Sequence, residues 1–69
     1  MNIENKCLII TCENNKAQLS GVMTLDFAKE ESKKYFQDDN AIITIMEEDK
    51  FTGMRTVVAK RENGEWINF

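Results

Sequence analysis

The residue types that carry most enzyme chemistry are scarce in this chain. Its 69 residues include two cysteines and no histidine. Histidine is the only side chain whose ordinary pKa lies in the physiological range, so a general base would have to be a carboxylate, lysine, tyrosine or thiol with a strongly shifted pKa. Such shifts require deep burial, which a chain of this length rarely provides. We therefore expect a protein that is not an enzyme, with no catalytic residue and no cofactor.

The two cysteines, Cys7 and Cys12, lie in one apolar run that predicts a strand. Side chains alternate along a strand, so five steps place the two thiols on opposite faces. The same five steps separate them by about 16 Å, whereas a disulfide requires Cα atoms within about 7 Å. We expect two free thiols in a reducing, cytoplasmic compartment and no metal site formed by the pair.

Acidic residues form two clusters, Asp38-Asp39 and Glu47-Glu48-Asp49. A strand between them would hold them about 23 Å apart, so they cannot share a metal ion. Neither has the spacing of a calcium-binding loop, and we expect two solvated turns. Asp38 and Asp39 follow a predicted helix, whose dipole disfavours acids there by about 0.3–1 kcal/mol. A basic partner would offset that cost, which makes both residues candidates for partner binding.

Three aromatic residues are candidate anchors for a partner. Phe27 falls outside the apolar stripe of the predicted helix, so it is either an exposed anchor or packed over the sheet edge or against the N-terminal loop. Trp66 stands beside Arg61 in a predicted hairpin, where it either caps the hairpin through a cation–π contact or stacks on nucleic-acid bases. Phe69 follows in the same strand. The net charge of −3 repels phosphate backbones and disfavours nucleic acid as a partner.

The elements that position these residues follow a ββαβββ order. Apolar and β-branched runs predict strands over residues 3–12, 16–23, 41–46, 55–61 and 65–69. Between the second and third strands, residues 25–37 predict a helix with Thr24 as its N-cap. Its apolar stripe comprises Leu25, Ala28, Ser32, Tyr35 and Phe36. We expect one α+β domain over residues 1–69, with the helix packed on an antiparallel sheet.

Two turns and one glycine bear on the register of the strands. Asn14-Asn15 predicts a hairpin turn between the first two strands, and Gly21 marks a bulge or a close approach. Asn63-Gly64 predicts a type I′ turn, which pairs Arg61 with Trp66. Cross-strand partners share a face. One face then carries Val58, Lys60, Ile67 and Phe69, and the other carries Val57, Ala59, Arg61 and Trp66.

The last hairpin also resembles a known family. Its residues from Val57 to Lys60 and from Glu62 to Phe69 resemble the closing hairpin of cystatin-like domains. The resemblance covers these twelve residues, and we take no function from it.

Both faces of the predicted sheet carry apolar side chains, yet one helix covers only one of them. A second copy is the simplest cover for the other. We therefore expect a non-catalytic protein-binding module that acts through a protein partner and forms a homodimer, with Trp66 or Phe69 at the contact. The alternative is a nucleic-acid-associated accessory protein that uses the C-terminal hairpin with Trp66 and Arg61. No apolar run approaches the roughly 18 residues of a membrane span, so we expect no membrane contact.

Overall fold

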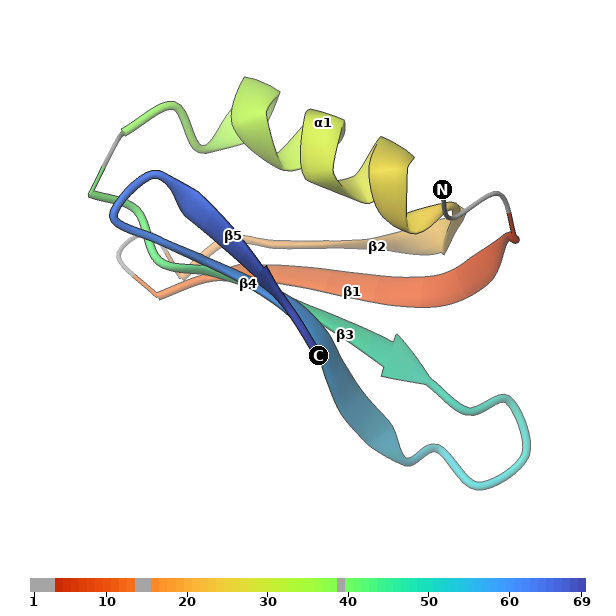
Figure 1. Cartoon of the computed structure of the whole chain (residues 1–69). Helices are drawn as coiled ribbons and strands as arrows, with labels where there is room; N and C mark the ends of the chain where they lie inside the picture. The colour runs from red at the N-terminus through yellow and green to blue at the C-terminus, as the bar shows by residue number, and fades with distance from the viewer. Residues whose placement is uncertain (1–3, 14–15, 39) are drawn as a thin grey trace.

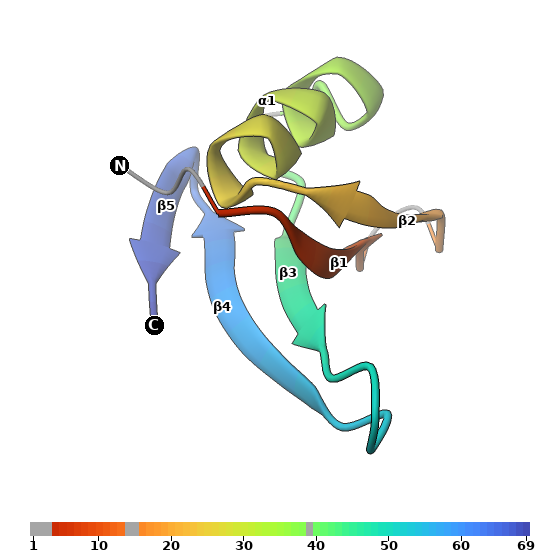
Figure 2. The ribbon, with the colours of Figure 1, turned by 90° about the vertical axis from the view of Figure 1, so that its right-hand side faces the viewer.

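The computed structural model describes residues 4–13, 16–38 and 40–69. Its five strands form one antiparallel sheet in the order β2-β1-β3-β4-β5, and α1 crosses one face of it (Figures 1 and 2). The predicted α+β fold with the order ββαβββ is confirmed. The elements are β1 (Lys6–Cys12), β2 (Gln18–Met23), α1 (Leu25–Tyr35), β3 (Ile43–Glu48), β4 (Arg55–Glu62) and β5 (Glu65–Asn68). The predicted Asn14-Asn15 turn lies outside the described residues.

The β1 strand is central, as its apolar character on both faces indicates. It pairs with β2 on one side and with β3 on the other. The register with β2 is continuous, so Gly21 is not a bulge. A Cβ atom at Gly21 would lie 3.3 Å from the terminal methyl of Met23, a close approach that a small movement of this flexible side chain would relieve.

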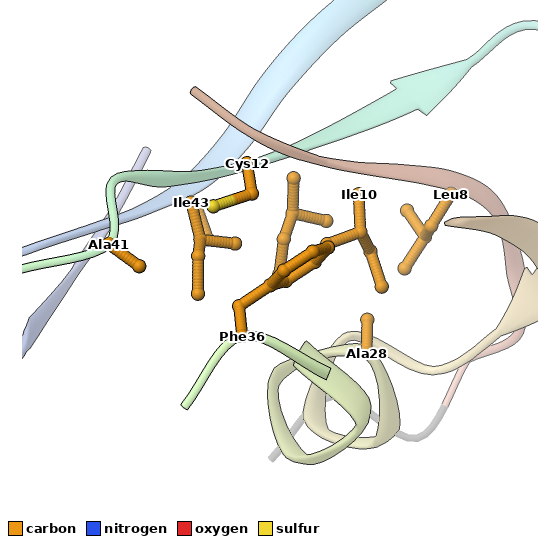
Figure 3. Close-up of a cluster of buried hydrophobic side chains, with 9 residues drawn as sticks. Leu8, Ile10, Cys12, Ala28, Phe36, Ala41 and Ile43 are labelled. Atoms are coloured by element: carbon orange, nitrogen blue, oxygen red, sulfur yellow. The ribbon is translucent and has the colours of Figure 1, made fainter. Parts of the chain in front are cut away.

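The core lies between α1 and the sheet (Figure 3). Ala28 and Ser32 are the buried residues of the helix, and the ring of Phe36 fills the space beyond them. The Ser32 hydroxyl donates to the Lys29 carbonyl oxygen at 2.7 Å, which satisfies a polar group at a fully buried position. The strands contribute Leu8, Ile10, Cys12, Ile43, Ile45 and Ala59 to the same cluster.

The start of α1 is as predicted, but its end is not. The Thr24 hydroxyl accepts a hydrogen bond from the Phe27 amide at 3.1 Å and caps the helix. The helix ends at Tyr35, two residues before the predicted end. Phe36 leaves helical geometry and is buried, whereas Tyr35 is 60% exposed. The placement of Tyr35 on the buried stripe is therefore wrong, because Phe36 occupies the space at that end of the core.

The β3 strand begins and ends two residues later than predicted. Glu47 and Glu48, expected in a loop, pair with residues of β4. Their carboxylates also bind cations on neighbouring strands, since Glu47 pairs with Lys6 at 3.5 Å and Glu48 with Arg55 at 3.1 Å. Cross-strand pairs of opposite charge stabilise a sheet, which accounts for the extension of β3 into an acidic sequence.

The last hairpin has the predicted turn and pairing. Asn63 and Gly64 have φ values of 54° and 77°, as a type I′ turn requires. Arg61 pairs with Trp66, and the ladder continues until the Phe69 amide donates to the Val58 carbonyl oxygen at 3.0 Å.

A β-bulge interrupts β4 and changes which face its side chains occupy. Ile45 pairs with Ala59, whereas the next residue, Met46, pairs with Val57. Val58 therefore has no partner on β3, and it packs against the core instead. Val57 shares the opposite face with Met46. The predicted faces of Val57 and Val58 are both wrong, because they assumed uninterrupted alternation.

Replacement of Gly64 by valine should destabilise the protein by about 1 kcal/mol or more, because a β-branched residue resists positive φ. Space is open around this position, so the loss would report backbone strain alone. Glu62→Val, at an exposed strand position of the same hairpin, is the matched control. Thermal unfolding should show a lower Tm for Gly64→Val than for the control, and equal Tm values would contradict the turn.

Candidate functional site

The sequence-predicted partner residues do not form one surface. Phe27 lies on α1 and is 52% exposed. Asp38 is exposed beyond the helix, where its carboxylate accepts a hydrogen bond from the Asn40 amide at 2.8 Å. Asp39 lies outside the described residues. Trp66 and Phe69 occupy opposite faces at the β5 edge, because Trp66 pairs with Arg61 on the helix side and Phe69 continues the face of Ile67.

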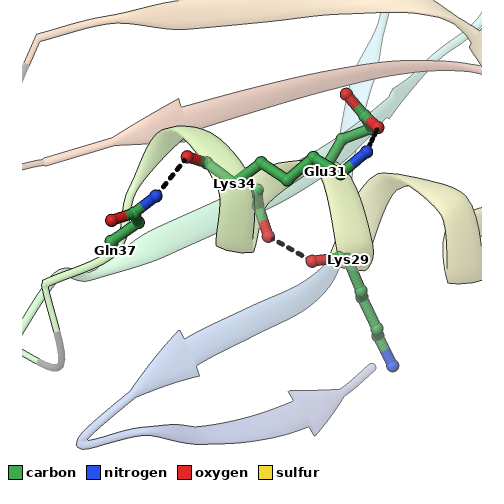
Figure 4. A network of polar contacts seen from close by, with 5 residues as sticks. Lys29, Glu31, Lys34 and Gln37 are labelled. Atoms are coloured by element: carbon green, nitrogen blue, oxygen red, sulfur yellow. Dashed lines mark hydrogen bonds and ion pairs between the residues drawn. The ribbon is translucent and has the colours of Figure 1, made fainter.

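Trp66 is half-buried and connects the last hairpin to the helix. It packs against the core cluster, and the Lys29 ammonium lies 5.5 Å from the centroid of its ring. The same ammonium donates to the Asn68 side-chain oxygen at 2.6 Å. Figure 4 shows Lys29 extending from α1 toward the hairpin. The cation over the ring is therefore Lys29, although sequence reasoning expected Arg61 in that position.

An apolar stripe crosses the sheet face that α1 leaves uncovered. Ile9 on β1 pairs with Met46 on β3, and Met46 pairs with Val57 on β4. Phe69 directly follows β5, and alternation from Ile67 places it on the same face. We call these four residues the open-face stripe. It crosses β1, β3 and β4 to the β5 edge. Figure 2 shows that α1 lies over the other face of the sheet.

Exposure increases along the open-face stripe. Ile9 is buried without help from the helix, Val57 is 40% exposed and Phe69 is 73% exposed. Ile67, on the same face of β5, is 50% exposed. An apolar patch of this kind on a small protein is typical of a protein contact. Sequence reasoning singled out Phe69 but missed Val57, whose position depends on the bulge.

Most of the charges beside the open-face stripe are paired. Arg55 pairs with Glu48 at 3.1 Å, and Lys60 pairs with Glu62 at 3.8 Å. Glu65, which faces Glu62 across β4 and β5, has no ion pair among the described residues and leaves one negative charge on this rim. An apolar strip with a polar rim is the arrangement found in protein–protein interfaces.

The acidic run at the end of β3 has a structural role. Glu47 and Glu48 bind Lys6 and Arg55, as described above. Asp49 accepts hydrogen bonds from the backbone amides of Phe51 at 2.8 Å and Thr52 at 3.0 Å. The Thr52 amide, followed by that of Phe51, lowers the pKa of this carboxyl below its ordinary value. Within the described residues, no group of three or more acidic, cysteine or histidine side chains could hold a metal ion.

Comparison with known proteins adds no family to this description. No family model matches the chain, and searches of curated proteins and of solved structures found no match. In the described part of the chain, no helix has the length and apolar character needed to cross a membrane.

The Asp49 carboxyl should titrate below its ordinary pKa of 3.8. A lowered pKa in the folded state means that Asp49 stabilises the turn above its unfolded pKa and that this contribution is lost as the pH falls through its folded pKa. Carbon-detected NMR titration of the carboxyl measures the value directly. The Phe51 and Thr52 amides should shift with the same midpoint, while the Gly64 amide in the other hairpin serves as control. A midpoint at or above 3.8 would contradict the assignment.

Proposed function

We propose that the protein is a non-catalytic protein-binding module whose open-face stripe is its docking surface. The observation that carries the proposal is the row of Ile9, Met46, Val57 and Phe69 on the sheet face without a helix. Burying such side chains contributes about 25 cal/mol for each Å² of apolar surface removed from water. A complex in which a partner covers this face is therefore stabilised without any change in the fold.

The occupant that we propose is a second copy of the chain. Two ion pairs neutralise most of the rim of the stripe, so Glu65 is the main source of repulsion when two identical faces meet. Two sheets pack face to face about 10 Å apart, with strand directions within about 30° of each other. The pair would form four layers, with a helix on each outer side. A chain of 69 residues also gains stability from a core shared with a second copy, because small domains bury a low fraction of their surface when they fold alone.

A dimer built this way keeps the helix side of each copy free for a further protein partner. Phe27 and Asp38 are both exposed there, on α1 and just beyond it. The nucleic-acid alternative depends on Trp66 as a stacking platform, and Lys29 already occupies a position over that ring. We therefore favour protein binding over nucleic-acid binding.

Phe69→Ser should weaken self-association about tenfold or more, because burial of a phenylalanine side chain contributes about 1.5–3 kcal/mol. Phe51→Ser is the matched control, since Phe51 is 96% exposed and lies in the β3–β4 turn, outside the stripe. Sedimentation equilibrium at micromolar to high micromolar concentration should show wild type at twice 8.0 kDa. The Phe69 variant should shift toward the single-chain mass.

Two outcomes would overturn this proposal. One is a wild-type chain that stays at 8.0 kDa at high micromolar concentration. The other is an equal weakening by the Phe51 control, which would place the contact elsewhere. A stable complex with a different protein that Phe69→Ser abolishes, without self-association, would keep the docking face and replace the second copy as its occupant.

We also propose that the protein resides in a reducing, cytoplasmic compartment. The redox state of its two thiols tests this proposal. Cys7 is partly exposed on the open face, whereas Cys12 is buried on the helix face, and both are free. Protein purified without reductant should have the mass of two free thiols. Alkylation should modify Cys7 faster than Cys12, and dimer formation should slow the reaction of Cys7 as concentration rises. Mass spectrometry measures both, and a Cys7–Cys12 bridge would contradict the sheet itself.

A further inference from the structure

A basic hollow lies on the helix side of the molecule, remote from the open-face stripe. It has a volume of about 420 Å³ and lies between the end of α1 and β4. Its lining consists of Lys33, Lys34, Phe36, Gln37 and Arg61. Three of these five side chains are cationic, and none is acidic.

Two nitrogen donors on this side of the sheet lack acceptors. The Arg61 Nε and the Trp66 Nε1 atoms are buried, and neither has a hydrogen-bond partner. The two residues pair directly across β4 and β5, so their side chains share the helix face. A buried donor without a partner is costly, and such groups in proteins are normally satisfied. Of these two residues only Arg61 lines the hollow, so the acceptor that is missing there, among the described residues, is one for Arg61.

Two of the three positive charges in the hollow are also uncompensated. Lys34 pairs with Glu31 at 3.2 Å. Neither Lys33 nor Arg61 has an ion-pair partner among the described residues, although the whole chain carries a net charge of −3. Two free cations, one of which is the guanidinium with the unsatisfied Nε–H, form a site for an oxyanion with several acceptor atoms.

The end of α1 does not prevent an anion from binding there. The negative end of a helix dipole repels anions, but the carbonyls in this turn already have donors. The Phe36 amide binds the Ser32 carbonyl at 2.8 Å, and the Gln37 side chain binds the Lys34 carbonyl at 3.2 Å (Figure 4).

We infer that this hollow binds the phosphate group of a small phosphorylated molecule. A phosphate carries close to two negative charges, which match the two uncompensated cations. The Arg61 guanidinium provides a planar edge of donors suited to two phosphate oxygens, and the Lys33 ammonium binds as a point charge. The acidic chain as a whole favours a compact ligand over a long nucleic-acid strand, whose many phosphates it would repel.

Titration with inorganic phosphate at constant ionic strength, followed by NMR of the side-chain N–H groups, tests this site. Trp66 is the single tryptophan, and Arg55 and Arg61 are the arginines of the chain, so the three signals separate. We expect a saturable shift of the Arg61 Nε–H signal, because Arg61 lines the hollow. The Arg55 signal should not move, because Arg55 already pairs with Glu48 on the other face.

Arg61→Gln and Lys33→Gln should each weaken phosphate binding about tenfold or more, because each removes a charge-assisted contact. Lys60→Gln is the matched control, since it removes the same charge from the adjacent residue on the opposite face. The Lys33 variant, at an exposed helix position, keeps the test valid if the Arg61 variant fails to fold. Phe69→Ser should leave phosphate binding unchanged, which separates this test from that of the open face.

Three results would overturn the inference. The first is a linear, unsaturable shift that sodium chloride reproduces. The second is equal weakening by Lys60→Gln, which would indicate general charge attraction. The third is binding of single-stranded oligonucleotide with a steep salt dependence while inorganic phosphate fails to bind, which would assign the cations to a nucleic-acid surface.

Discussion

The packing of one short helix on a wide sheet is the interaction on which the rest of this structure depends. An 11-residue helix is about 16 Å long and about 10 Å wide, whereas five strands span about 19 Å. The core therefore forms where α1 meets the central strands, around Ile10, Ile45 and Ala28. Phe36 closes this core beyond the last helical turn. One sheet face is covered by these contacts, and the other has no helix to cover it.

The bulge in β4 decides what the uncovered face presents. Because Val58 has no partner on β3, it packs toward the core and Val57 joins Met46 on the open side. Without the bulge, Val58 would pair with Met46 on the open face and Val57 would turn toward the helix side. The bulge thus decides which of the two valines the open face presents. The basic hollow on the helix side is independent of that row, so both surfaces are accessible in one molecule.

The parts of the fold that were predictable from sequence have local causes. The Asn63-Gly64 turn fixed the hairpin register because both residues tolerate positive φ, and Thr24 capped the helix through a bond within one turn. The parts that were missed arise from tertiary contacts. Alternation could not reveal the bulge, and the choice between Tyr35 and Phe36 depended on the shape of the core. Lys29 reaches Trp66 from 37 residues away, which spacing alone does not indicate.

The central claim is that the open-face stripe forms a contact between two copies of the chain. Intermolecular nuclear Overhauser effects in a sample that mixes labelled and unlabelled chains test it most directly. The account predicts effects between copies from the methyl groups of Ile9, Met46 and Val57. It predicts none from the methyl groups of Ile10, Ile43 and Ile45, which lie in the core under α1. Effects between copies that involve only α1 residues, or none at all at high micromolar concentration, would contradict it.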